Sequence, residues 1–139
     1  MTTDLKDLSM FKELNKYIAK KDLNCTQFAS IFFPEIADLL LKYGNPEDKD
    51  FNIKRANKEI KEKLIEIKEA PLDTLILVSF ETNLGTSAHV GVLYNNYVYH
   101  YTENRGIVAE DINNILDKNV NYHKIKLYKV KEITNDNNN

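Results

Sequence analysis

Residues 88–102 read AHVGVLYNNYVYHYT, and this stretch predicts a β-hairpin around which the rest of the fold is built. β-Branched residues recur in 88–93, and 97–102 alternate with a period of two, as expected for strands. Asn95 and Asn96 lie between them, and asparagine tolerates the positive φ that both central residues of a type I′ turn adopt.

The hairpin brings two histidines together. If the residues that flank the turn pair with each other, His89 and His100 become diagonal neighbours on one face, about 7–8 Å apart at the backbone. Gly91, opposite His100, leaves room between them, whereas a shift of one residue would send them to opposite faces. The chain has three histidines and one cysteine, so a shared face marks a candidate site, with Cys25 as the natural partner.

The bulk properties favour one globular domain. A length of 139 residues allows a real core, and we expect this domain over 1–133, with a disordered tail at 134–139. A net charge of −2 gives no footprint for nucleic acid. No stretch is suited to spanning a membrane, and the first ten residues lack the features of a signal peptide, so we expect cytoplasmic synthesis.

The pattern places helices before strands. Apolar spacing predicts a helix over 3–20, a second from Cys25 to about Gly44 with an interruption at Pro34, and a third over 53–68 within a charged insertion at 44–70. Predicted strands follow at 74–80, 88–93, 97–102, 107–108 and 124–130, with a helical turn at 109–118. The expected class is α+β, with N-terminal helices packed on a small antiparallel sheet.

Cys25 has the local setting of a nucleophile. Asn24 is a good N-cap, so Cys25 would occupy the first helical position, where the helix offers a partial positive charge and unpaired N–H groups. His89 would take the thiol proton, and His100 would orient His89. The same N–H groups could form an oxyanion hole. These residues together predict acyl transfer from an amide through a thioester.

Each feature taken alone also has a structural interpretation. A lone cysteine near Phe28 and Ile31 is often a small buried hydrophobic residue, and a histidine in a strand often has a structural role. The charged face of 53–68 is typical of a solvated helix. His123 has no partner of this kind and is expected at the surface. The combination of a helix-start cysteine with two histidines on one face favours a site.

Three segments resemble the NlpC-type cell-wall cysteine peptidases, a papain-like family. NCTQF at 24–28 is similar to the family's DCSGF motif, HVGVLYNNYVYHYTENRGIV at 89–108 to its HVGIYLG–F–HA segment, and PLDTLILVSF at 71–80 to its PGDLVFF segment. The resemblance implies a papain-like fold with Cys25 as nucleophile, His89 as general base and acid, and His100 as orienting residue. It also implies that no metal or organic cofactor is needed, and that the substrate is a peptide or isopeptide bond of the peptidoglycan stem.

The chain departs from the family pattern next to Cys25. The family has a tyrosine and a glycine-rich segment before the cysteine, where this chain has IAKKDL at 18–23. Tyr17 is the nearest upstream tyrosine, and Gln27 stands where the family has glycine. Asn24, Gln27 and Tyr17 are therefore our candidates for contacts with the substrate or the oxyanion.

Three functions remain open at this point. The first is hydrolysis of peptidoglycan by an enzyme that a phage tail or a specialised secretion system delivers to the cell wall. The second is a papain-like deamidase or acyltransferase effector that acts on a protein. The third is a catalytically inert phage-tail or assembly protein on the same scaffold.

Overall fold

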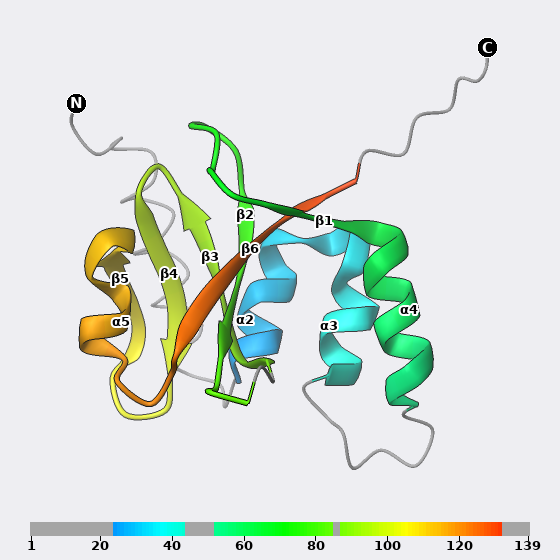
Figure 1. Ribbon diagram of the computed structural model, residues 1–139, viewed down its shortest axis with the longest axis horizontal. Helices are drawn as coiled ribbons and strands as arrows, with labels where there is room; N and C mark the ends of the chain where they lie inside the picture. Colours follow the sequence, from blue (N-terminus) through cyan, green and yellow to red (C-terminus); the bar gives the residue numbers. More distant parts are fainter. Residues whose placement is uncertain (1–23, 44–51, 85–86, 132–139) are drawn as a thin grey trace.

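The computed structural model describes residues 24–43, 52–84 and 87–131 (Figure 1). This part of the chain forms a six-stranded antiparallel sheet with strand order β1-β6-β2-β3-β4-β5, together with four α-helices. The predicted α+β class is therefore confirmed. The helix expected over 3–20, the helix end at Gly44 and the tail at 134–139 lie outside the described residues.

Helix α2 (Cys25–Phe32) begins as the sequence predicts. The Asn24 side chain accepts a hydrogen bond from the backbone N–H of Gln27, and the Gln27 side chain accepts one from the backbone N–H of Asn24, each at 2.8 Å. This reciprocal capping box fixes Cys25 as the first helical residue. The helix ends before Pro34, which opens a 3₁₀ turn (Pro34–Ile36) that leads into α3 (Ala37–Tyr43).

The third predicted helix is shorter than its apolar spacing indicates. Helix α4 (Ile53–Lys63) gives way to strand β1 (Leu64–Ile67), so the expectation of a helix to residue 68 is wrong. β1 pairs with β6, with Leu64 opposite Val130, and Leu64 is buried. Because these long-range contacts outweigh the local helical preference, the segment expected as an insertion supplies an edge strand of the sheet.

The histidine hairpin forms with the predicted register. Strands β3 (Ser87–Tyr94) and β4 (Tyr97–Thr102) pair Tyr94 with Tyr97. Asn95 and Asn96 have φ values of 48° and 78°, as a type I′ turn requires. β2 (Ile76–Glu81) is buried along its whole length, as its apolar sequence predicts.

The region after the hairpin contains a longer strand than predicted. β5 (Gly106–Asp111) pairs with β4 as far as Tyr97–Asp111, so residues 109–111 are strand and the predicted helical turn starts later. That turn comprises a 3₁₀ segment (Ile112–Asn114) and α5 (Ile115–Lys118). The final strand, β6 (Lys124–Val130), has the predicted bounds.

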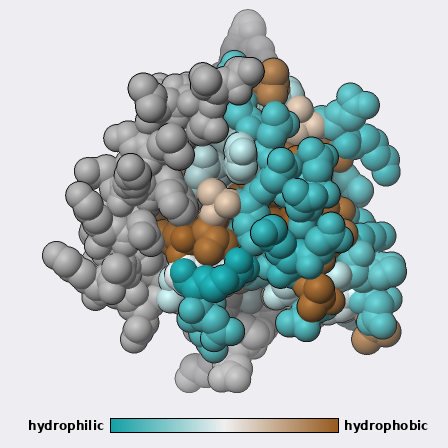
Figure 2. Space-filling model, turned by 90° about the vertical axis from the view of Figure 1, so that its left-hand side faces the viewer, coloured by the Kyte–Doolittle hydropathy of each residue, from teal (hydrophilic) through white to brown (hydrophobic). Residues whose placement is uncertain are grey.

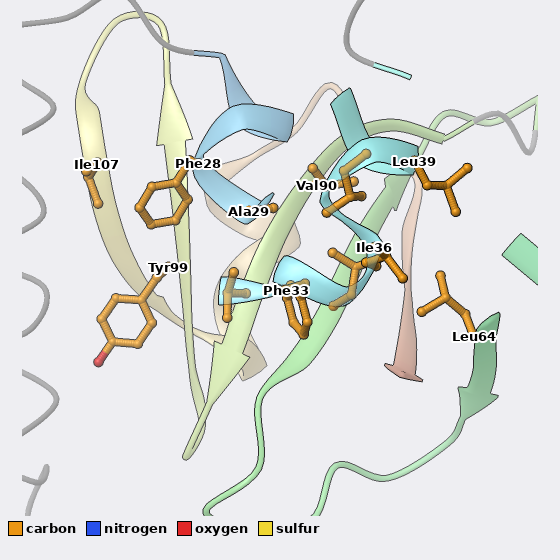
Figure 3. Close-up of a cluster of buried hydrophobic side chains, with 12 residues drawn as sticks. Phe28, Ala29, Phe33, Ile36, Leu39, Leu64, Val90, Tyr99 and Ile107 are labelled. Carbon is orange, nitrogen blue, oxygen red and sulfur yellow. The ribbon is translucent and has the colours of Figure 1, made fainter. Parts of the chain in front are cut away.

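Two apolar clusters hold the layers together. On one face of the sheet, Phe28 and Leu39 from α2 and α3 pack with Val90, Tyr99 and other buried residues (Figure 3). On the opposite face, Ile115 of α5 packs on Ile76, Val78, Phe80, Leu93 and Val98. Figure 2 views the side of the molecule where β5 and α5 lie, and its coloured surface is mostly hydrophilic. The sheet is therefore covered on both faces, with α2 bringing Cys25 to one of them.

Candidate functional site

Three side chains from adjacent strands form a hydrogen-bonded line. His89 Nε2 lies 2.8 Å from His100 Nδ1, and His100 Nε2 lies 2.7 Å from Glu110 Oε1. His100 is fully buried, and Glu110 is 7% exposed. The predicted contact between the two histidines is therefore present, and Glu110 of β5 extends it. Sequence reasoning missed Glu110, because residues 109–118 were expected to be helical.

Glu110 is held as a carboxylate by the groups around it. Arg105 Nη1 donates to Glu110 Oε2 at 3.0 Å, and Asn119 Nδ2 donates to Glu110 Oε1 at 3.0 Å. Burial raises the pKa of Glu110, but the hydrogen bonds from Arg105, Asn119 and His100 outweigh burial and lower the pKa to about 2. At neutral pH the line therefore ends in a fixed negative charge.

This charge determines where the imidazole protons lie. An ionised carboxylate only accepts hydrogen bonds, so His100 donates from Nε2 and presents a bare Nδ1. That nitrogen in turn accepts from Nε2 of His89. Neutral His89 then has its lone pair at Nδ1, the nitrogen left free by the His100 contact. The arrangement assigns His89 the tautomer that a general base acting through Nδ1 needs.

Aromatic rings enclose His89 and keep it neutral. Its ring lies 4.8 Å from Phe80 between centroids and stacks on Tyr122 at 5.7 Å with an interplanar angle of 13°. Burial, followed by the nearby His100, lowers the pKa of His89 to about 4. Burial also lowers the pKa of His100, although Glu110 opposes that effect. Both histidines are therefore neutral at pH 7.

Cys25 reaches the same strand from the start of α2, and burial together with the nearby Cys25 raises the pKa of Tyr122, whose ring stacks on His89. His89 pairs with Phe80 and shares its face, whereas α2 packs on the face that carries Val90. Burial raises the pKa of the Cys25 thiol, although the backbone N–H groups of Val90, Thr26 and Cys25 lower it. The sulfur therefore lies beside the backbone of the residue that follows His89, as a neutral thiol at pH 7.

Cys25 and His89 both line one cavity of about 880 Å³. Within the described part of the chain, no hydrogen bond joins the two side chains, and the shared cavity is what brings the two residues together. Asn24 also lines this cavity, whereas Gln27 is used in the capping box and is not part of the lining. Tyr17 lies outside the described residues. His123 is exposed, as predicted.

Neither a cluster of metal-ligating side chains nor a membrane-spanning helix occurs in the described ranges. Among residues 24–43, 52–84 and 87–131, no group of three or more His, Cys, Asp or Glu side chains is arranged to hold a metal ion. None of the helices described is both long and apolar enough to cross a lipid bilayer.

The two lowered histidine pKa values predict that the fold loses stability in mild acid. An unfolded histidine titrates near its usual value of about 6.5, so the unfolded chain binds more protons than the folded chain between this pH and about 4. The stability contributed by neutral His89 is complete above about pH 6.5 and is lost as the pH falls to about 4. We expect up to about 3 kcal/mol from His89. Urea unfolding at a series of pH values measures this loss, and a flat profile over the interval would contradict it.

Gly91 permits the contact between the histidines, so Gly91→Ala is expected to disturb it. An added Cβ would lie 2.9 Å from His100 Cβ and 3.1 Å from the Tyr99 carbonyl oxygen, which the backbone fixes. We expect a loss of about 1–3 kcal/mol in unfolding free energy. Gly106→Ala serves for comparison, because its added Cβ meets no atom within 4 Å and any loss there comes from backbone strain at φ +72°, not from a clash. A Gly91→Ala variant as stable as the original in urea unfolding would contradict this prediction.

Comparison of the chain with protein-family models, with curated proteins and with solved structures found no match.

Proposed function

We propose that this protein is a cysteine hydrolase with a papain-like domain of the NlpC type, which cleaves an amide bond through a thioester. One observation carries the proposal: a buried carboxylate fixes two imidazoles in series and leaves a basic Nδ1 on His89, next to the strand residue that Cys25 contacts. The resemblance of the segments around Cys25, His89 and His100 to NlpC-type motifs supports the same assignment.

In the first half of the proposed reaction, His89 Nδ1 takes the thiol proton as Cys25 Sγ attacks the amide carbonyl carbon. The neutral states of both groups at pH 7 suit this general-base route, because the proton moves only when the bond to carbon forms. Backbone N–H groups at the start of α2 stabilise the negative oxygen of the tetrahedral intermediate. The carbon–nitrogen bond then breaks, His89 protonates the leaving amine, and the thioester remains.

Hydrolysis of the thioester completes the cycle. A water molecule gives one proton to His89 Nδ1 while its oxygen attacks the thioester carbon, and the carbon–sulfur bond breaks. The proton returns from His89 to Cys25 Sγ, which restores the starting state. His100 and Glu110 stabilise the transient charge on His89 and hold its orientation, and neither changes its own protonation state.

The substrate class that we propose is a peptide or isopeptide bond in peptidoglycan stem peptides. Purified muropeptides, incubated separately with the original protein and with Cys25→Ala and read by mass spectrometry, test this. We expect two fragments whose masses sum to the substrate plus one water, formed only by the protein with Cys25. Intact muropeptides in both reactions would overturn the proposed substrate, and equal cleavage by both proteins would overturn the proposed nucleophile.

A further inference from the structure

The lining of the cavity beside Cys25 includes polar side chains that the proposed reaction does not use. Ser79 and Glu81 come from β2, Ser87 from β3 and Lys126 from β6, and all four line the cavity. The hydroxyl oxygens of Ser79 and Ser87 lie 2.6 Å apart, so these two serines satisfy each other. Glu81 is different, because this residue is only 4% exposed and its carboxylate is only partly compensated.

The two oxygens of Glu81 have different surroundings. Oε2 lies 3.7 Å from Nζ of Lys126, which is an ion pair longer than a hydrogen bond. Oε1 is buried and has no hydrogen-bond partner among the described residues. A buried carboxylate oxygen without a donor is unfavourable, and native structures rarely keep one without a reason. A ligand in this cavity can therefore supply the hydrogen-bond donor that Glu81 Oε1 lacks.

We propose that Glu81 determines specificity by binding a protonated amino group of the substrate at Oε1. This inference rests on the proposed function, since it places the amino group in the cavity whose wall includes Cys25. A carboxylate accepts hydrogen bonds only, and an ammonium group brings up to three donors and the opposite charge. The cavity lining also includes the apolar side chains of Leu39, Leu40 and Ile60, which suit aliphatic parts of the same substrate.

Binding to the Cys25→Ala variant tests this without turnover. The probes are the tripeptide alanyl-γ-glutamyl-alanine with a free amino terminus and its N-acetylated form, which lacks the positive charge. Isothermal titration calorimetry is expected to show at least tenfold tighter binding of the free form. Adding Glu81→Gln should bring the two affinities together, while adding Glu66→Gln, at another carboxylate of the cavity lining, should leave the preference unchanged.

Several outcomes would overturn the proposal. One is an equal affinity of Cys25→Ala for both peptides, and another is that neither peptide binds at millimolar concentration. The third is that the preference for the free amino terminus persists after Glu81→Gln is added. The first two do not depend on the folding of the Glu81 variant, whose stability is checked by thermal unfolding. A preference that depends on Glu81 in a protein that cleaves no muropeptide would contradict only the proposed function. Cleavage that requires Cys25 but shows no preference for the amine would contradict only the role of Glu81.

Discussion

Cys25→Ala is expected to abolish hydrolysis, with a loss of at least about 10⁴-fold in kcat, because no other group in the proposed site can form the thioester. The substitution removes one partly buried sulfur at the start of α2 and leaves the Asn24 capping box in place. The fold should therefore persist, and substrate should still bind. Single-turnover hydrolysis of a muropeptide, followed by chromatography, measures the loss.

Cys25→Ser is the matched control for this prediction. A serine keeps the shape and the hydrogen-bonding capacity of the site, but its hydroxyl is a far weaker nucleophile than a thiol in a site built for sulfur. We expect activity close to that of Cys25→Ala. Activity of Cys25→Ala within tenfold of the original protein would remove Cys25 from the mechanism.

His89→Gln has the second largest expected effect, a loss of roughly 10³-fold in kcat with little change in stability at neutral pH. The glutamine amide can still donate to His100 Nδ1, which keeps the line to Glu110 intact, but it has no basic nitrogen. Steady-state kinetics compared with urea unfolding separates the catalytic effect from a structural one. A variant that keeps a tenth of the original kcat would show that His89 is not the general base.

The hairpin and the start of α2 could be predicted from sequence because their signals are local. Two asparagines define a turn whose length fixes the register, and Asn24 with Gln27 defines a capping box. The length of β5 and the strand character of Leu64–Ile67 could not be predicted, because pairing with β4 and β6 determines them. Glu110 was missed for the same reason, since only the sheet brings it to His100.

The protonation state of Cys25 is a second property that could not be predicted from the sequence. A helix start beside an imidazole indicates a thiol whose pKa is lowered, and the backbone N–H groups do act in that direction. Burial outweighs them and raises the pKa of the thiol, and burial also keeps His89 neutral. Because burial depends on packing between distant segments, the local pattern favours a thiolate–imidazolium pair where the structure has a neutral thiol and a neutral base.

The central claim is that Glu110 fixes the tautomers of both histidines and leaves a bare Nδ1 on His89. Long-range ¹H–¹⁵N NMR of the protein labelled at histidine reads this directly at pH 7, with His89→Gln identifying the signals of His89. We predict that His89 and His100 are neutral and that each carries its proton on Nε2. A His89 ring that is charged, or that carries its proton on Nδ1, would contradict the account.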